Sequence, residues 1–232
     1  AFWNGDGQPL MLLVKTDGVA NSKPIIKVGP DISVSSMYQT ADFATDAVKD
    51  TYSVTLSALP GAGLSAGQLV YVNEKYDSTL THFNTGGGQT DGSGYLGWGE
   101  AAGGTTANSR ALGQAMEIES VVGLVVTFTT PFHTTYRTSK TAHLGTQNAT
   151  ATTMFGVEDL FLTGGDGGDG GGTILFGFAT YCWAKNVESS GHGPQYGGGC
   201  VRFFASFRCE IRDSYLHSDS TDINNISPGG AY

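Results

Sequence analysis

The stretch 180-TYCWAKNVESSG-191 returns in altered form as 207-FRCEIRDSYLHS-218. The two segments align without a gap at an interval of 27 residues, and the aligned pairs include Cys182 with Cys209, Ala184 with Ile211, Lys185 with Arg212, and Asn186 with Asp213. The interval continues, because windows 147–173, 174–200 and 201–227 tile the C-terminal part of the chain. A strand-rich repeat of this length is typical of solenoid proteins, in which each repeat forms one turn of a coil.

Stacked turns should place equivalent side chains in vertical files, because each strand pairs with its copy about 4.8 Å away in the next turn. Interior positions must then be apolar or small in every turn. Three files carry the prediction: Phe155–Cys182–Cys209, Val157–Ala184–Ile211, and Asp159–Asn186–Asp213. The first two fit the interior, with cysteine acting as a small apolar group. The third fits a corner, where short amide and carboxylate side chains bind backbone groups and one another.

The composition favours strands and turns over helices. Charged residues make up only 14% of the chain and 35 of its 232 residues are glycine. The plentiful β-branched and small polar residues suit pleated surfaces and tight corners, so we expect an all-β fold. The net charge of −9, without a cluster of Lys or Arg, argues against nucleic-acid binding. The longest apolar run, 10-LMLLV-14, is too short to span a membrane.

The N-terminal part of the chain holds short strand-like runs outside the repeat, at 10–15, 24–30, 32–36, 52–60 and 64–76. A Gly-rich stretch over 77–110 predicts a long loop. Residues 114–132 predict a β-hairpin with its turn at Val122–Gly123. We therefore expect residues 1–52 to form the N-terminal strands of the solenoid, 53–137 an inserted β module with the Gly-rich loop, and 138–232 further turns that continue beyond Tyr232.

The repeat also resembles a known superfamily. The segments 182-CWAKNVES-189 and 209-CEIRDSYLHS-218 are similar to turns of the right-handed parallel β-helix, or pectate-lyase-like, superfamily. The runs 65-SAGQLVYVNE-74 and 111-ALGQAMEI-118 look similar to bacterial and phage members. The resemblance implies a right-handed parallel β-helix with an inserted small β module. It implies no single activity, since the superfamily includes polysaccharide lyases, glycoside hydrolases, epimerases, phage tailspikes and adhesins.

Charged residues of the repeat form the first group of candidate site residues. Polysaccharide lyases of the superfamily typically use aspartate-bound calcium with an Arg or Lys base, and its hydrolases use paired carboxylates. In this sequence Glu158, Lys185 and Arg212 would form one file of the stack. The candidate catalytic residues are Lys185 and Arg212, Asp213 beside this file, and His192 on a following loop. The alternative is a surface ladder of charge pairs that stabilises the fold weakly.

Aromatic residues form the second group, because sugar rings present apolar C–H faces that pack on aromatic rings. Trp183 directly follows the interior residue Cys182, so strand alternation points its side chain outward. Tyr196 lies on a later loop of the repeat, and Tyr95 and Trp98 lie in the long Gly-rich loop. We expect these four aromatic residues to bind substrate. The alternative is that the loop aromatics pin their loops to the body and that Trp183 packs under the inserted module.

The segment 164-GGDGGDGGG-172 places Asp166 and Asp169 in a glycine frame. Calcium prefers carboxylate and carbonyl oxygens, so these two aspartates are candidate metal ligands. The nonapeptide calcium repeat also requires tandem copies and a hydrophobic residue in every cycle, and the sequence has neither. The sequence thus leaves two readings, Ca²⁺ bound at Asp166 and Asp169, or no cofactor and an exposed turn.

Three functions remain open from the sequence. The leading hypothesis is an extracellular or cell-surface protein that binds a polysaccharide and, if catalytic, cleaves it as a lyase or glycoside hydrolase. The second is a structural or adhesive protein, such as a phage fibre, that assembles through the solenoid. The third is sugar binding without catalysis. Few lysines, many Gly and Thr residues and a sequon at Asn148 fit an exported protein. The expected partners are a polysaccharide and further copies or turns of the solenoid, with neither nucleic acid nor a membrane.

Overall fold

The computed structural model describes residues 11–14, 24–30, 37–75, 112–163, 173–190 and 201–216. These residues form strands and one short 3-10 helix, η2 (Thr138–Lys140), so the all-β prediction is confirmed. The chain divides into two compact units, Ala1–Asp31 with Ala151–Tyr232, and Ile32–Thr150. We call them the parallel unit and the antiparallel unit, after the direction of their strands. Within the described ranges, no helix has the length and apolar character needed to cross a membrane.

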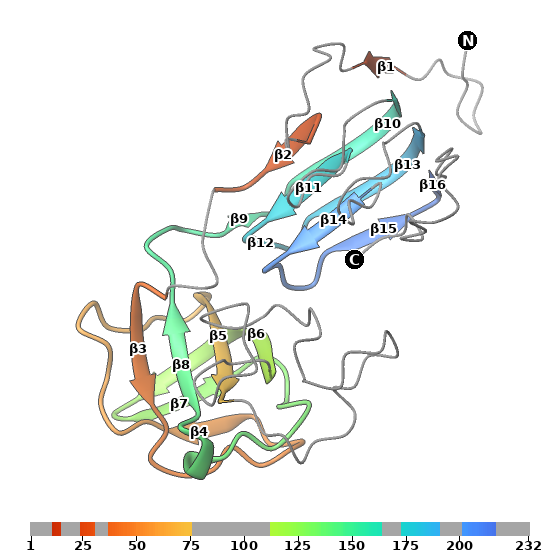
Figure 1. The fold of residues 1–232 in the computed structure, drawn as a ribbon. Coiled ribbons are helices and arrows are strands. Elements are labelled where there is room, and N and C mark those ends of the chain that lie inside the picture. The colour runs from red at the N-terminus through yellow and green to blue at the C-terminus, as the bar shows by residue number, and fades with distance from the viewer. Residues whose placement is uncertain are drawn as a thin grey trace. The chain divides into compact units, whose positions relative to one another are not determined.

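Three sheets make up the described part of the parallel unit, and every strand pair in them is parallel (Figure 1). The first contains, in spatial order, β1 (Met11–Val14), β10 (Gly156–Thr163), β13 (Trp183–Ser190) and β15 (Glu210–Arg212), with β16 (Tyr215–Leu216) also paired to β13. The second contains β2 (Ile26–Val28), β11 (Ile174–Gly177) and β14 (Val201–Phe204). The third pairs β9 (Thr152–Thr153) with β12 (Ala179–Thr180).

Successive strands of these sheets pair at the interval predicted from the sequence. Gly156 pairs with Trp183, and Trp183 pairs with Glu210, in the first sheet. Ile174 pairs with Val201 in the second sheet. The repeat seen in the sequence is therefore a repeat of the backbone. β1 pairs with β10 and β2 pairs with β11, although the antiparallel unit separates these strands in the sequence. The antiparallel unit is therefore inserted in the chain between strands that pair with each other.

Corners of the parallel unit repeat at the same interval. Asp159, Asn186 and Asp213 all adopt left-handed backbone, with φ of 58°, 50° and 51°. Asn and Asp tolerate this conformation better than other residues with a side chain, because their short polar groups bind locally. Asn186 Nδ2 donates a hydrogen bond to Asp159 Oδ1 in the neighbouring strand, at 2.7 Å. The predicted corner file is confirmed.

Apolar side chains between the sheets form the core of the parallel unit. Its buried members are Val28, Val157, Leu162, Ile174, Phe176, Ala179, Cys182, Ala184, Val187 and Val201. The predicted interior positions of Val157, Cys182 and Ala184 are thus confirmed. The prediction for Phe155 is wrong, because its side chain is 49% exposed. Phe155 follows the short strand β9 and lies outside every strand that the structure describes.

Six strands form the single sheet of the antiparallel unit that the described residues contain (Figure 1). The spatial order is β3 (Gln39–Asp42), β8 (His143–Thr146), β5 (Leu69–Glu74), β6 (Leu112–Val122), β7 (Val125–Phe128) and β4 (Ser53–Thr55). β6 and β7 pair as the predicted hairpin, with Gly123 and Leu124 between the paired residues Val122 and Val125. β3 pairs with β8, so this unit extends beyond residues 53–137 at both ends.

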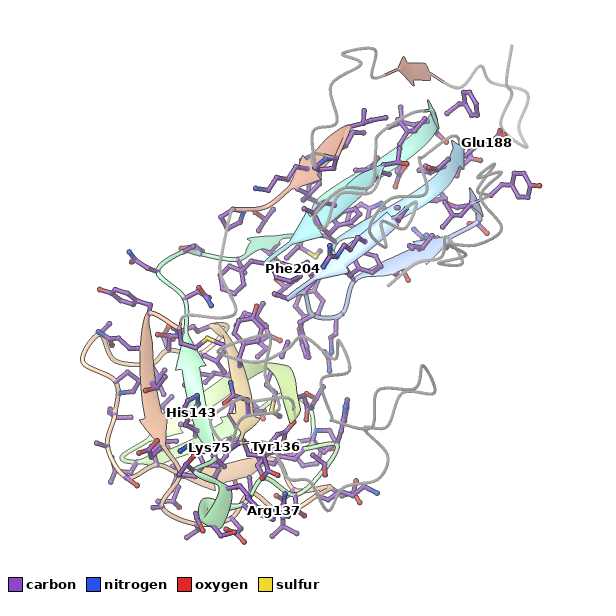
Figure 2. All side chains as sticks on the ribbon, in the orientation of Figure 1. Lys75, Tyr136, Arg137, His143, Glu188 and Phe204 are labelled. Atoms are coloured by element: carbon purple, nitrogen blue, oxygen red, sulfur yellow. The ribbon has the colours of Figure 1, made fainter. Side chains whose placement is uncertain are left out.

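The core of the antiparallel unit is rich in aromatic residues. The Phe132 ring lies against the rings of Phe43, Phe128 and Tyr136, with ring centres 6.5, 5.4 and 5.9 Å apart. One charged side chain is also buried: Glu74, whose side chain is only 1% exposed, forms an ion pair with Arg137. The backbone N–H of Arg137 donates to Glu74 Oε2 at 2.6 Å. Figure 2 labels Tyr136 and Arg137, which follow each other directly in the chain.

Candidate functional site

The first sheet of the parallel unit presents six regularly placed residues to the outside. Val157 and Ala184 of this sheet are buried in the core and Ile211 packs against it, so the residues on either side of them point outward. The register then creates two rows across β10, β13 and β15, namely Gly156–Trp183–Glu210 and Glu158–Lys185–Arg212. We call these six residues the outer face. The charged file expected from the sequence is therefore present.

Trp183 has a fixed position on the outer face. Its indole lies over Gly156 of the neighbouring strand, so close that a Cβ added to Gly156 would lie 2.3 to 2.5 Å from three ring atoms. The indole Nε1 donates a hydrogen bond to Glu158 Oε1 at 2.5 Å. One ring face is thus packed on the sheet, and the residue as a whole is half-buried. The outward orientation of Trp183 expected from strand alternation is what the structure shows.

The charges of the outer face are not equivalent. Glu158 accepts the hydrogen bond from Trp183, and Arg212 Nε lies 3.5 Å from Glu210 Oε1. The Arg212 and Glu210 side chains are 51% and 58% exposed, and a pair so accessible to water stabilises the fold little. Lys185 lies between Glu158 and Arg212 in its row. Among the residues that the structure describes, it forms neither an ion pair nor a hydrogen bond.

Asp213 belongs to a different part of the surface from the two basic candidates. It directly follows Arg212 but lies in the corner file, with left-handed backbone. Its counterparts one and two strands away are Asn186 and Asp159, which bind each other. The left-handed backbone thus gives a structural reason for an Asp at this position, and the catalytic role of Asp213 stays a prediction. Of the candidate catalytic residues that lie in the described ranges, Lys185 and Arg212 share one row and Asp213 does not.

The remaining predicted site residues lie outside the described residues. They are His192, Tyr196, Tyr95 and Trp98, together with the candidate calcium ligands Asp166 and Asp169. Within the described part of the chain, no group of three or more His, Cys, Asp or Glu residues is arranged to hold a metal ion. The calcium prediction stays a prediction.

Sequence reasoning did not identify Gly156 and Glu158 as the supports of Trp183. The signal was available, because Gly156 precedes Trp183 by one repeat and is the only residue of its row without a side chain. A glycine leaves the surface of a sheet open for a neighbouring ring to lie flat. Glu188 also went unassigned; it lies toward the carboxyl end of β13 and pairs with Tyr215 of β16 (Figure 2).

Two of the three cysteines lie among the described residues, and both Cys182 and Cys209 are free thiols in the interior stack. Cys182 Sγ donates to the carbonyl oxygen of Thr180 at 3.4 Å, and Cys209 Sγ donates to that of Ala179 at 3.5 Å. Burial raises the pKa of the Cys209 thiol to about 11. The thiol form therefore predominates at neutral pH, which suits an apolar interior and not a nucleophile.

Comparisons with known proteins concern the fold. No protein-family model and no curated protein matches this chain. The structure is similar to the tailspike protein gp49 from Pseudomonas phage LKA1, with a TM-score of 0.56 and 15% sequence identity. That match covers 91% of this chain and 29% of the tailspike. The chain therefore spans less than a third of the tailspike's length, and the likeness is one of fold.

Two further tailspikes match at lower similarity. The Gp54 tailspike of Acinetobacter baumannii bacteriophage AP22, solved in complex with A. baumannii capsular saccharide, gives a TM-score of 0.43 at 16% identity. That match covers 76% of this chain and 24% of the tailspike. The Pseudomonas phage phi297 tailspike gp61 gives a TM-score of 0.46 at 11% identity, covering 89% of this chain and 37% of the tailspike. Neither match is close enough to support an argument about this chain.

Proposed function

We propose that this chain is a polysaccharide-binding part of a tailspike-like β-helix protein that acts outside the cell or on a virion surface. The observation that carries the proposal is the position of Trp183, whose indole is held flat on the outer face of a parallel sheet. Such a ring offers a rigid apolar surface with polar groups beside it. This is the combination that a sugar ring requires, with apolar C–H groups on its faces and hydroxyls at its edge.

The proposed architecture is a right-handed parallel β-helix of the pectate-lyase-like type. Parallel pairing at a constant interval, corners that repeat at that interval and an apolar core between the sheets support it. The similarity to the LKA1 tailspike supports the same architecture. The antiparallel unit is then the inserted β module.

The chemistry of the outer face supports binding more directly than cleavage. Glu158, Lys185 and Arg212 can donate to or accept from sugar hydroxyls around Trp183. Site groups on strands are held more precisely than groups on loops, which favours specific recognition. Cleavage by elimination or hydrolysis would need a further acid, base or calcium ion that converges on Lys185 and Arg212. Elimination would leave unsaturated ends and hydrolysis would leave new reducing ends, and both products can be assayed in the polysaccharide samples of the binding experiment below.

A structural or adhesive role as part of a fibre is the second candidate, and one observation favours it. The last described strands expose interior residues more than the strands before them. Phe176 and Cys182 are 0% and 1% exposed, whereas Phe203 and Cys209 are half-buried. A strand edge with apolar neighbours favours pairing with another strand. Sedimentation analysis of the purified protein tests this role, which predicts ordered assemblies in the absence of any polysaccharide.

The experiment that tests the main proposal measures binding to a panel of acidic and neutral polysaccharides. We expect Trp183→Ala to weaken binding about tenfold, corresponding to roughly 1.4 kcal/mol. Trp183→Phe should retain part of the affinity. Tyr52→Ala is the matched control, because Tyr52 is an aromatic residue of the antiparallel unit that is 51% exposed. A folded protein that binds no polysaccharide, or a Trp183→Ala variant that binds as well as the parent, would contradict the proposal.

A further inference from the structure

β1, β2 and β9 pair with the structure as the three sides of one turn would. Their partners are β10, β11 and β12, which follow one another in the chain. β10 and β11 pair in turn with β13 and β14, and Thr180 of β12 forms a bridge with Phe207. β9 thus takes the place of the third side after β1 and β2, although the antiparallel unit lies between β2 and β9 in the sequence.

The pairing register gives the length of this interruption. Ile26 of β2 pairs with Ile174 at an offset of 148 residues, whereas Thr152 of β9 pairs with Ala179 at the repeat interval of 27 residues. The two offsets differ by 121 residues, which is the length of the segment 31–151. We call this segment the insertion. Without the insertion, β2 and β9 would both pair with the next turn at the repeat interval.

The two ends of the insertion join the parallel unit at the same place. A Cβ added to Gly29 would collide with the carbonyl oxygen of Gly177, so the backbones of these two residues are in close contact. The carbonyl oxygen of Pro30 lies 3.6 Å from the position of a Cβ on Gly177. After the insertion, the backbone N–H of Thr152 donates to the carbonyl oxygen of Phe178 at 3.0 Å. The chain therefore leaves and re-enters the parallel unit beside two consecutive residues, Gly177 and Phe178.

The antiparallel unit holds its own two ends together. The backbone N–H of Tyr38 donates to the carbonyl oxygen of Thr146 at 2.8 Å, next to the paired strands β3 and β8. One position further out, Gln147 Nε2 donates to Met37 Sδ at 3.3 Å. An inserted unit with adjacent ends imposes no separation on the two host residues that it connects. The host can then keep the conformation that it would have without the insertion.

The outer face belongs to one unit only. Trp183 and its supports Gly156 and Glu158 all lie in the parallel unit, on the neighbouring strands β10 and β13. In a stacked repeat each turn contacts only its neighbours, so the position of the Trp183 ring depends on these strands.

We infer that the insertion can be removed without disturbing the parallel unit, and that polysaccharide binding at Trp183 requires the parallel unit alone. The second half of the inference rests on the proposed function, and the first half does not.

A deletion of residues 31–151, which joins Pro30 to Thr152, tests both halves. The shortened chain should fold, with the amides of β10 and β13 protected from hydrogen exchange as in the parent. It should bind the polysaccharide that the parent binds within about twofold of the parent's affinity, because every residue of the outer face remains. Trp183→Ala should weaken binding by the same factor in the shortened and the full chain.

A second deletion of the same length is the matched control. Removing residues 29–149 keeps the pairing register but places Thr150 where Gly29 lies. Gly29 has a φ of 103° and no room for a Cβ beside Gly177. The control should therefore melt about 5 °C below the 31–151 deletion. Equal melting temperatures would show that the chain does not leave the parallel unit at Gly29 and Pro30, and would overturn the inference.

The full chain gives an independent readout. Phe132→Ala removes a ring that contacts three aromatic rings in the core of the antiparallel unit, and it leaves the outer face intact. Binding should stay within about twofold of the parent's affinity, even where the amides of β5, β6 and β8 have lost protection. Loss of binding while β10 and β13 remain protected would overturn the second half of the inference.

The outcomes separate the inference from the function on which its second half rests. A shortened chain that stays unfolded, both when joined directly and with two glycines between Pro30 and Thr152, would overturn the inference and leave the proposed function standing. A shortened chain that folds but loses the binding of the parent would overturn the second half alone. If neither chain binds any polysaccharide, the proposed function fails, whereas protection of β10 and β13 in the shortened chain would still support the first half.

Discussion

In the parallel unit, Glu158, Lys185, Glu210 and Arg212 lie on the outer face, whereas in the antiparallel unit polar residues of β5 and β8 are buried. Asn73, Glu74 and His143 are at most 4% exposed. The difference follows from how each unit is ordered. A repeated backbone fixes its side chains through register and needs only a narrow apolar interior, which leaves flat surfaces free for ligands. The antiparallel unit instead encloses one core, so its buried polar groups serve the fold.

The largest expected loss of stability comes from a substitution that disrupts the core of the antiparallel unit alone. Phe132 is fully buried against three aromatic rings, and Phe132→Ala should cost about 3–5 kcal/mol of unfolding free energy through the cavity it leaves. Hydrogen exchange measured by strand should show lost protection in β5, β6 and β8. Protection in β10 and β13 should be retained. Equal loss in all five strands would show that the two units unfold as one.

The next effect concerns the buried ion pair. Arg137→Met leaves the Glu74 carboxylate buried without its cation and should cost about 3 kcal/mol, near the lower end for buried pairs because Arg137 is 28% exposed. Chemical denaturation measures this loss. The double variant Glu74→Leu/Arg137→Met should recover much of it, since no charge remains buried. If the double variant is as unstable as Arg137→Met alone, the unpaired Glu74 carboxylate is not the cause of the lost stability.

A smaller effect should separate two contributions to stability at the corner of the parallel unit, that of the left-handed backbone at Asn186 and that of its hydrogen bond to Asp159. Asn186→Ala places an unsuitable residue in left-handed backbone and removes the bond to Asp159, at a combined cost of about 2 kcal/mol. Asn186→Gly loses only the bond and should cost about 1 kcal/mol. Thermal unfolding of the two variants gives the comparison. An equal cost would mean that the backbone conformation contributes nothing.

The smallest effect is a pH dependence at the surface of the antiparallel unit. Asp46 Oδ1 accepts hydrogen bonds from the backbone N–H and the hydroxyl of Thr138, both at 2.7 Å, and these bonds lower the pKa of Asp46 below its usual 3.8. The contribution to stability is present above pH 3.8 and is lost as the pH falls through the lower folded-state pKa. Asp46→Asn should therefore flatten the fall in melting temperature below pH 4. A parallel fall in parent and variant would contradict this assignment.

The sequence was informative where one constraint is repeated. The interval between Cys182 and Cys209, the corner file and the outward Trp183 were all predictable, because each follows from equivalent positions or from strand alternation. The exposure of the Phe155 side chain was not, since nothing in the repeat distinguishes Phe155 from its equivalents Cys182 and Cys209. A repeat predicts which residues are equivalent, but it does not predict how far each of them is buried.

The antiparallel unit was less predictable for a related reason. The pairing of β3 with β8 joins residues about a hundred positions apart without any shared pattern. β5 also has no exposed face, because every one of its six residues is buried. In the candidate site, Lys185 and Arg212 could be placed in one row from the sequence. The packing of the Trp183 ring on Gly156 could not be predicted, because it depends on the side-chain conformation of Trp183.

The most direct test of the central claim is a titration of the labelled protein with the best-binding polysaccharide, followed by the indole ¹H–¹⁵N signal of Trp183, which the Trp183→Phe variant identifies. The proposal predicts that this signal shifts together with the backbone amides of β10, β13 and β15, while those of β3, β5 and β8 stay in place. Saturable binding that leaves the Trp183 signal and the amides of the outer face unchanged would contradict it.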